Sequence, residues 1–484
     1  MIDYIKDNTW DILLFINYVL SIGAAILVLL KNVNPTKTLT YIIVLLVFPF
    51  VGLIVYYFFG QEYRKVKIFN RKDVLNQKII KDVQEELKLA PAEIRIIRNQ
   101  LDEKVKLVRL LSKSDKSPLT MKNELELLKN GEEKFPRLFE DLKTAKDHIH
   151  VEYYILEDDK IGTQFIDLLC EMAKSGVEVR LSYDYVGSSI SSKAKRKMKI
   201  AGIQFMPFMP VLFSGLTGQM NYRNHRKIVI IDGKIGYVGG INVSDKYVNN
   251  GKSDVYWRDT HLRIEGEAVK ELQINFFNNW NFVTDSTLKI TPNYFPPNSI
   301  ETELPVQIAA SGPDSDWANI MEAIFTSINT ADKYVYITTP YFIPNEQIVT
   351  ALQVASRSGV DVRLVIPKNS DSWVAKYATN SFLDRLLEAN VKIYRYCKGF
   401  IHAKTIVVDD MFSTVGTSNM DNRSFNINFE INALIYNRDF TLKLKQQFFD
   451  DVEECELLDK EEWFNRPKID KLKESYSRLW APLL

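Results

Sequence analysis

The strongest constraint on the fold is an internal repeat. The segment Thr144–Glu152 aligns with Thr330–Thr338, and each has the pattern of an alternating apolar strand that follows an amphipathic helix. Farther along, Ala173–Leu181 aligns with Ser356–Leu364, where a glycine ends a helix and a second strand begins. A strand, a helix and a second strand form the βαβ unit of a parallel or mixed sheet. The repeat therefore predicts an α/β fold with two duplicated lobes, whose mixed sheets are flanked by helices.

The limits of the lobes follow from changes in composition. Residues 291–303 are rich in proline and form the natural linker between the lobes. We therefore predict a first lobe over residues 116–300 and a second over residues 301–484. Residues 61–115 have the pattern of a charged amphipathic helical linker, which suits a position along a membrane surface and a solvated spacer equally well.

Two uncharged apolar runs, at about residues 12–30 and 39–59, precede the lobes. At about 1.5 Å per helical residue, each run reaches roughly 30 Å, the thickness of a bilayer core. Residues 1–60 are therefore predicted to form a two-helix transmembrane hairpin. Acidic residues before the first run and the close second run disfavour a cleaved signal peptide. Pro49 and Gly52 suit a membrane helix better than a buried soluble hairpin.

Basic residues predict the orientation of the hairpin. Those that follow the second run are Arg64, Lys65, Lys67, Arg71 and Lys72, whereas the loop between the runs has Lys31 and Lys37. Because cytoplasmic flanks of membrane helices are enriched in Lys and Arg, we expect a multi-pass protein of the cell membrane with both lobes in the cytoplasm. The bilayer is thus a predicted partner.

Each lobe has the same His-x-Lys-x4-Asp motif near its end. The motif residues are His225, Lys227 and Asp232 in the first lobe and His402, Lys404 and Asp409 in the second. The chain has five histidines, and a random histidine has this pattern on the order of once in 200 cases, so two chance matches are implausible. An asparagine follows each histidine at the same spacing, Asn242 in the first lobe and Asn419 in the second.

Strand alternation puts the His and Lys of each motif on one face, so each lobe presents an imidazole, an ammonium group and a nearby amide to a common pocket. Asp232 and Asp409 stand at strand ends, where they can equally be turn residues that anchor the motif. His148 and His150 lie on an apolar strand and are expected to be packed. A structural role is also favoured for His261.

The paired motif resembles that of the phospholipase D superfamily. The flanking sequence is similar to bacterial cardiolipin synthases over essentially the whole chain, in the segments Asn224–Ile228, Trp257–Gly266, Gly416–Phe425, Asn428–Glu430 and Pro482–Leu484. This resemblance implies transfer of a phosphatidyl group from one phosphatidylglycerol to another, giving cardiolipin and glycerol through a covalent phosphatidyl-histidine intermediate.

The resemblance also implies roles for the residues. His225 is expected to be the nucleophile and His402 the general acid and base, although the duplication itself does not say which is which. The lysines and asparagines would stabilise charge on the phosphoryl oxygens. Asp259 and Glu430, which follow their histidines in the sequence, resemble the carboxylates that orient each imidazole.

No cofactor or metal is expected, because a lysine beside each motif histidine would repel a cation. Three cysteines, Cys170, Cys397 and Cys455, match neither a zinc pattern nor a disulfide framework. With 62 Lys and Arg against 61 Asp and Glu, the net charge of +1 predicts no nucleic-acid partner and argues against a nuclease with this motif pair. Phosphatidylglycerol is the predicted lipid partner.

Two other functions stay open from the sequence. The motifs do not distinguish water or another alcohol from a lipid as the acceptor, so a hydrolytic phospholipase D is the nearest rival. A membrane scaffold with a degenerate phosphate-binding cleft is disfavoured, because both histidines, both lysines and both asparagines are present.

Overall fold

The computed structural model describes residues 8–30, 35–48, 50–59, 77–89, 97, 101–114, 117–209, 222–249, 255–284 and 288–484. By its contacts the chain divides into two compact units, residues 1–63 with 211–221 and residues 64–210 with 222–484. Among the described residues the first unit is helical, and the second contains the β-strands.

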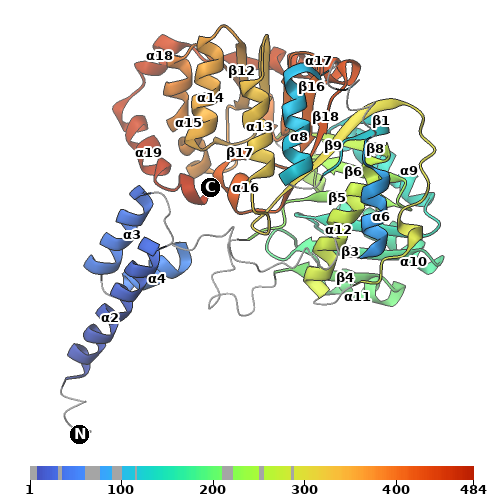
Figure 1. Ribbon diagram of the computed structural model, residues 1–484, viewed down its shortest axis with the longest axis horizontal. Coiled ribbons are helices and arrows are strands. Elements are labelled where there is room, and N and C mark those ends of the chain that lie inside the picture. The colour runs from blue at the N-terminus through green and yellow to red at the C-terminus, as the bar shows by residue number, and fades with distance from the viewer. Residues whose placement is uncertain are drawn as a thin grey trace. The chain divides into compact units, whose positions relative to one another are not determined.

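The helical unit consists of α2 (Thr9–Leu30), α3 (Pro35–Val47) and α4 (Val51–Phe59) (Figure 1). Among the described residues, α2 alone is long and apolar enough to cross a membrane, and the apolar part of α3, Thr38–Val47, is shorter. Many apolar side chains of α2 are exposed, including those of Phe15 and Leu30. Such a surface is typical of a helix that contacts lipid rather than a soluble core.

The second apolar run forms two helices instead of the single span predicted over residues 39–59. Between α3 and α4, Phe50 has a φ of 63°, outside the helical range. The sequence has Pro49 at this break, and proline lacks an amide hydrogen and clashes with the preceding helical turn. The amide of Phe50 donates to Asn17 Oδ1 on α2 at 2.9 Å, so a polar side chain satisfies the backbone there.

The second unit is built on one 15-stranded mixed sheet that runs through both halves (Figure 1). In the first half its strands are β1 (Thr120–Lys129), β2 (His148–Tyr153), β3 (Glu178–Asp184), β4 (Gln204–Phe208), β5 (Lys227–Ile231), β6 (Ile235–Gly239) and β8 (Thr260–Gly266). In the second half they are β9 (Glu303–Ser311), β10 (Tyr334–Thr338), β12 (Asp361–Pro367), β13 (Lys392–Tyr396), β15 (Thr405–Val408), β16 (Phe412–Gly416), β18 (Glu430–Ile435) and β19 (Cys455–Leu457).

The strand order of the first half is the same as that of the second. In the first half the order is β3-β2-β5-β6-β8-β1, and in the second it is β12-β10-β15-β16-β18-β9. β2 pairs with β3 in parallel and with β5 antiparallel, as β10 does with β12 and β15. The halves join where β1 pairs antiparallel with β9, with Thr120 opposite Val306. The predicted α/β class with a mixed sheet is confirmed, but the halves share one sheet.

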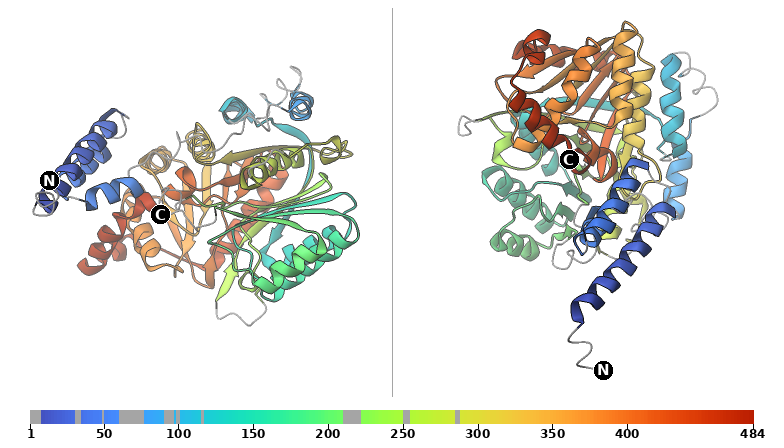
Figure 2. Two further views of the ribbon diagram at one scale, coloured as in Figure 1. Left: turned by 90° about the horizontal axis from the view of Figure 1, so that it is seen from below. Right: turned by 90° about the vertical axis from the view of Figure 1, so that its left-hand side faces the viewer.

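Helices cover both faces of the sheet (Figure 2). In the first half these are α9 (Asn130–Lys143), α10 (Lys160–Lys174), α11 (Ser192–Ala201) and α12 (Ala268–Thr284), with short helices η5 (Asp245–Tyr247) and η6 (Pro292–Tyr294). In the second half they are α13 (Asn319–Asn329), α14 (Glu346–Arg357), α15 (Trp373–Glu388), α16 (Asn422–Asn426), α17 (Arg438–Glu453), α18 (Lys460–Phe464), α19 (Lys468–Arg478) and η7 (Ala481–Leu483).

Alternating strand residues divide the core between the two faces. On β5, Ile228 and Ile230 join a cluster under α12 and α17 that crosses both halves. Their neighbours Val229 and Ile231 point the other way, into the core beneath α9 and α10. A third cluster, under α13, α14 and α15, fills the second half. The apolar cluster shared by α12 and α17 therefore ties the halves together.

The described part of the segment before β1 packs on this body. It contains α6 (Lys78–Glu86), η2 (Asp102–Lys104) and α8 (Val105–Ser114). Ile80 and Val83 of α6 are buried in the cluster shared by the halves, and Leu107 and Leu111 of α8 are buried in the core of the second half. The apolar faces of these amphipathic helices are thus covered by protein.

Candidate active site

The two motifs lie at equivalent places in the sheet. His225 comes just before β5, and His402 just before β15, the strand in the same position of the second half. Each approach to a motif runs parallel to a segment from the other half. β14 (Gly399–Ile401) pairs with β7 (Tyr256–Arg258), and Asn224 forms a parallel bridge with Phe429. The backbone amide of His225 donates to the Phe429 carbonyl at 2.9 Å, and that of His402 to Arg258 at 2.7 Å.

Each motif histidine is held by a carboxylate from the other half. His225 Nδ1 lies 2.9 Å from Glu430 Oε1, and His402 Nδ1 lies 2.7 Å from Asp259 Oδ2. Both carboxylates are buried, and both histidines are 8% exposed. Each carboxylate therefore contacts the imidazole of the opposite half rather than the histidine that it follows in the sequence. An Nδ1–H donated to the carboxylate leaves the Nε2 lone pair of each ring free.

The motif lysines are buried beside the histidines. Lys227 Nζ donates to the carbonyl of His225 at 2.6 Å, and Lys404 Nζ donates to the carbonyl of His402. Burial lowers the pKa of Lys404 to about 8, against the raising effect of Asp259 and Glu430. Burial also lowers the pKa of Lys227 well below its usual value. The ammonium groups are thus poorly solvated, so an anion entering the site would stabilise their charge.

The imidazoles are poised in the neutral form. Burial lowers the pKa of His225 to about 4; Glu430 opposes this shift, and Lys227 and Lys404 add to it. Burial, Lys404 and Lys227 lower the pKa of His402 well below its usual value. The charges of each half act on the histidine of the other, so the two motifs form one electrostatic site.

The two orienting carboxylates differ in their surroundings. Burial raises the pKa of Asp259 to about 6. Burial also raises the pKa of Glu430, but His225 and Lys227 outweigh it, so this pKa lies below its usual value. Thr417 Oγ1 donates to Glu430 Oε2 at 2.5 Å. At the equivalent position of the first half, Gly240 has no side chain, and a Cβ there would lie 2.0 Å from Asp259 Oδ1. A side chain at position 240 would therefore displace the Asp259 carboxylate from its place beside His402.

The asparagines after the two motifs make different contacts. Asn242 Oδ1 accepts the amide of Ile155 at 3.1 Å, and its Nδ2 donates to the Tyr247 hydroxyl at 2.5 Å. Asn419 Nδ2 donates to Asp421 Oδ2 at 3.0 Å, while its buried Oδ1 has no hydrogen-bond partner among the described residues. The amide of Asn242 is thus engaged by the protein, and that of Asn419 is only partly satisfied.

The motif aspartates lie away from the imidazoles. Asp232 is at the far end of β5 from Lys227, about 15 Å along a strand of this length. Its carboxylate accepts the backbone amides of residues 146, 147 and 148 at 2.8, 2.8 and 2.9 Å. Asp409 does the same for residues 332, 333 and 334 and also accepts from Lys104 Nζ at 2.8 Å. The aspartates thus hold the starts of β2 and β10.

The other histidines are packed. His148 and His150 are buried and hydrogen-bond Gln273 of α12, at 3.2 and 2.7 Å. His261 is buried, and its Nδ1 accepts the amide of Ile241 at 3.3 Å. The structure adds Lys134, a fully buried lysine whose Nζ donates to the Tyr153 hydroxyl at 2.9 Å. Lys134 stands outside the repeated motif, so no sequence pattern marked it.

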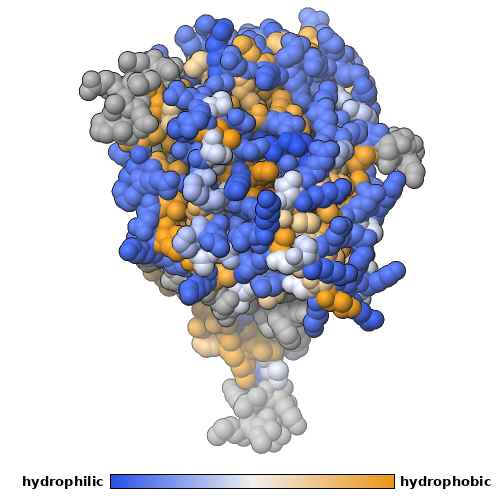
Figure 3. Space-filling model, turned by 90° about the vertical axis from the view of Figure 1, so that its right-hand side faces the viewer, coloured by the Kyte–Doolittle hydropathy of each residue, from blue (hydrophilic) through white to orange (hydrophobic). Residues whose placement is uncertain are grey.

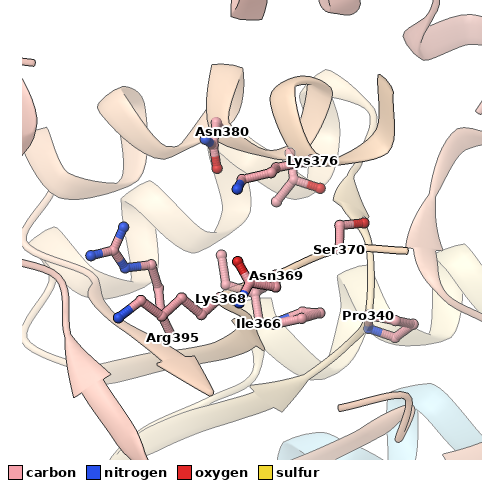
Figure 4. A pocket seen from close by; sticks show the side chains of 10 residues that line it. Pro340, Ile366, Lys368, Asn369, Ser370, Lys376, Asn380 and Arg395 are labelled. Atoms are coloured by element: carbon pink, nitrogen blue, oxygen red, sulfur yellow. The ribbon is translucent and has the colours of Figure 1, made fainter. Parts of the chain in front are cut away.

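A hollow with polar and basic walls lies at the end of β12 (Figure 4). It is lined by Pro340, Ile366, Pro367, Lys368, Asn369, Ser370, Lys376, Thr379, Asn380 and Arg395. Lys368 and Arg395 pair with Glu456, at 2.6 and 2.5 Å. Glu456 thus offsets the charge of two cations in the wall of the hollow. None of its lining residues belongs to either motif, so the hollow is separate from the two-histidine site.

Comparisons with known sequences match both halves and the N-terminal segment. The family described as "Cardiolipin synthase, PLD-like domain" matches residues 138–280 and 324–452. The family described as "Phospholipase D-nuclease N-terminal" matches residues 19–61. A cardiolipin synthase of Geobacillus sp. (strain WCH70) is 42% identical over 463 residues, 95% of this chain and 91% of the relative. The major cardiolipin synthase of Bacillus subtilis (strain 168) is 39% identical over 480 residues, 98% and 99% of the two chains.

A solved structure has a similar fold. The phosphatidylserine synthase of Haemophilus influenzae Rd KW20 superimposes with a TM-score of 0.59, covering 78% of this chain and 100% of its own. Its sequence identity is 15%, so the likeness concerns the fold alone.

Replacing the motif aspartates should destabilise the protein unequally. Asp409→Asn leaves the buried Lys104 without its anionic partner, and we expect a loss of about 3–5 kcal/mol in the free energy of unfolding. Asp232→Asn weakens backbone contacts only and should cost about 1–3 kcal/mol. Urea unfolding of detergent-purified protein measures both. The exposed Asp316→Asn is the control, with a change under about 0.5 kcal/mol. Equal losses for Asp232→Asn and Asp409→Asn would contradict the role given to Lys104.

The crosswise pairing can be tested by titrating the histidines. In protein with ¹³C-labelled histidine, the His225 resonance should titrate near pH 4. Glu430→Gln should lower the pKa of His225 further, because the ionised carboxylate favours the imidazolium. The His402 resonance should respond to Asp259→Asn instead. If Glu430→Gln shifted His402 and left His225 unchanged, each carboxylate would serve its own half.

Proposed function

Because this chain belongs to the bacterial cardiolipin synthases of the phospholipase D superfamily, we propose that it transfers a phosphatidyl group from one phosphatidylglycerol to another, giving cardiolipin and glycerol. The observation that carries the proposal is the pair of buried imidazoles, each oriented by a carboxylate of the opposite half, with a buried lysine beside each ring. Such a pair supplies one nucleophile and one proton carrier to a single phosphodiester. The enzyme is a phosphatidyltransferase of the phospholipase D type.

In the first step, Nε2 of His225 attacks phosphorus, and the bond from phosphorus to the glycerol oxygen breaks. His402 gives its Nε2 proton to that oxygen, so glycerol leaves as a neutral alcohol. In the second step, His402 removes the proton from a headgroup hydroxyl of the second phosphatidylglycerol. That oxygen attacks phosphorus, the bond to His225 Nε2 breaks, and cardiolipin is released with both histidines restored.

The nucleophile assignment has support from the two carboxylates. His225 gains positive charge when it is phosphatidylated, and Glu430, whose pKa lies below its usual value, stays ionised to stabilise that charge. Asp259, with its pKa raised to about 6, instead pairs with the histidine that must gain and lose a proton. His402 therefore suits the role of general acid and base.

The lysines couple the protonation of His402 to substrate binding. In the empty site, Lys404 and Lys227 disfavour the imidazolium form of His402. An anionic phosphodiester bound between the lysines would offset their charge and raise the pKa of His402, so protonation accompanies substrate binding. The same ammonium groups stabilise the charge that gathers on the non-bridging oxygens in the transition state.

The remaining motif residues divide into two groups. Asn419, whose amide is only partly satisfied, is proposed to contact the phosphoryl group. Asn242 is a positioning residue that holds Tyr247, whose ring lies 6.0 Å from that of His402. Asp232 and Asp409 are proposed to act through the backbone of β2 and β10, without touching substrate.

We also infer that the halves are duplicated lobes and that the N-terminal helices form a transmembrane hairpin. The matching strand order supports the duplication. The apolar helices α2, α3 and α4 support the hairpin, with α3 and α4 together forming the second crossing. The proposal that the lobes lie in the cytoplasm rests on the sequence alone, because the basic residues from Arg64 to Lys72 lie outside the described residues.

Purified protein given phosphatidylglycerol alone should form cardiolipin and an equal amount of glycerol. His225→Ala should abolish both products, because no covalent intermediate forms. His402→Ala should slow turnover by roughly 10²–10⁴-fold and leave a phosphatidyl adduct on His225. Lipid and peptide mass spectrometry measure these outcomes, with the packed-residue variant His148→Gln as control. Phosphatidic acid in place of cardiolipin would make the enzyme a hydrolase, and an adduct on His402 would reverse the roles.

The orientation can be read from a native cysteine. Cys397 is exposed on the second half, so a membrane-impermeant maleimide should leave it unlabelled in intact cells and label it after lysis. Cys397→Ser is the control for labelling at Cys455. Labelling of Cys397 in intact cells would place the lobes outside.

A further inference from the structure

The C-terminal helix α19 turns an apolar stripe outward. The residues of this stripe, which we call the C-terminal apolar face, are Ile469, Leu472, Tyr476, Leu479 and Trp480, with exposed fractions of 57, 64, 52, 75 and 44%. Ile469, Leu472 and Tyr476 are three and four residues apart and so lie on one side of α19, and Leu479 and Trp480 follow its last residue at the same spacings. A contiguous exposed apolar stripe of this kind is typical of a surface that binds a membrane or another molecule.

Ion pairs on the protein-facing side of the helix hold this orientation. Glu474 and Ser477 face the body and are 3% and 0% exposed. Arg466 Nη2 lies 2.6 Å from Glu474 Oε2 and 2.8 Å from Asp384 Oδ1 of α15. α15 and α19 run side by side in Figures 1 and 2. Turning the apolar stripe inward would separate Glu474 from Arg466 and leave the buried guanidinium with one carboxylate fewer, which disfavours that orientation.

The charge around this face is basic. The basic residues of α19 are Lys468, Lys471, Lys473 and Arg478, and its acidic residues are Asp470 and Glu474. Lys473 pairs with Asp470, Arg478 lies 3.6 Å from Glu346, and Glu474 pairs with Arg466. Lys468 and Lys471 therefore supply the excess positive charge of the described helix. Trp373, at the start of α15, adds a second exposed indole, 52% exposed. Aliphatic and aromatic side chains beside lysine and arginine are the composition of helices that lie in the interface of anionic membranes.

A short chain of contacts connects the end of this face to Asn419, the asparagine that follows the second motif. After α19, the carbonyl of Leu484 accepts the amide of Arg423 at 2.8 Å, and the carbonyl of Pro482 accepts Asn422 Nδ2 at 2.8 Å. Both partners belong to α16, whose N-cap Asp421 accepts Asn419 Nδ2.

The face of the molecule shown in Figure 3 differs from the C-terminal apolar face, because it is mostly hydrophilic, with scattered apolar patches.

We propose that the C-terminal apolar face docks on the headgroup region of a bilayer that contains anionic phospholipid, and so holds the two-histidine site at the membrane surface. The basic residues attract the headgroups, and the leucines and tryptophan enter the boundary of the acyl chains. The docking itself follows from the surface of α19, and only its use in catalysis rests on the proposed function.

The depth of the C-terminal apolar face in a bilayer can be measured without an activity assay. Full-length protein with Leu479→Cys, in a Cys397→Ser and Cys455→Ser background, is spin-labelled and placed one copy per nanodisc of phosphatidylglycerol and phosphatidylcholine. The label should collide with oxygen and be protected from a water-soluble nickel chelate. Ile200→Cys, on α11 and 77% exposed, is the matched control and should be open to nickel.

Two results would overturn the proposal. Free access of nickel to the label at position 479 would leave the face in water. Protection from both oxygen and nickel would mean that protein covers it, either the chain's own N-terminal helices or, if seen only when nanodiscs hold two copies, a second molecule.

Turnover on two forms of the same lipid separates docking from damage to the site. Leu472→Glu with Leu479→Glu should lower turnover of long-chain phosphatidylglycerol in vesicles by roughly tenfold or more. It should leave turnover of a short-chain, monomeric phosphatidylglycerol unchanged, and Ile200→Glu should leave both unchanged. Equal losses on both substrates would overturn the role in catalysis. A wild type inactive on both would count against the proposed function, while the depth measurement would still decide the docking.

Discussion

Each imidazole of the site is held by a carboxylate from the other half of the chain. His225 depends on Glu430 and His402 on Asp259, so neither half contains a complete histidine and carboxylate pair. The antiparallel pairing of β1 with β9 and the apolar cluster shared by α12 and α17 hold the halves in register. The packing that joins the two halves into one sheet therefore also brings each histidine to its carboxylate.

Burying four nitrogen bases beside two carboxylates is costly in an empty protein. Burial lowers the pKa values of both histidines and both lysines, which means that their charged forms are disfavoured until an anion arrives. The stability of the shared core offsets this cost, and the anionic phosphodiester proposed as substrate would stabilise the charged forms. In the proposed mechanism, the site is thus electrostatically complementary to the phosphoryl group before any substrate binds.

The sequence predicted the parts of this structure that repeat along the chain. The α/β class with its mixed sheet is confirmed, and the motif histidines and lysines lie together. The crosswise contacts could not be foreseen, because spacing along the chain associates Glu430 with His402 and Asp259 with His225, whereas pairing is set by how the halves dock. The sequence predicted one span where the structure has α3 and α4, although Pro49 disfavours a continuous helix at that point. Likewise, the motif aspartates share a pattern with the histidines but lie about a strand's length away.

The difference between Gly240 and Thr417 has a consequence for how such a site can arise. Two identical chains that exchanged carboxylates in this way would give both imidazoles the same neighbour and the same proton affinity. Under the proposed duplication, joining the two copies in one polypeptide lets each position mutate alone, so that a glycine beside Asp259 and a hydroxyl beside Glu430 can coexist. Two imidazoles that would be equivalent in a symmetric dimer can then differ in proton affinity, as the proposed roles of nucleophile and general acid require.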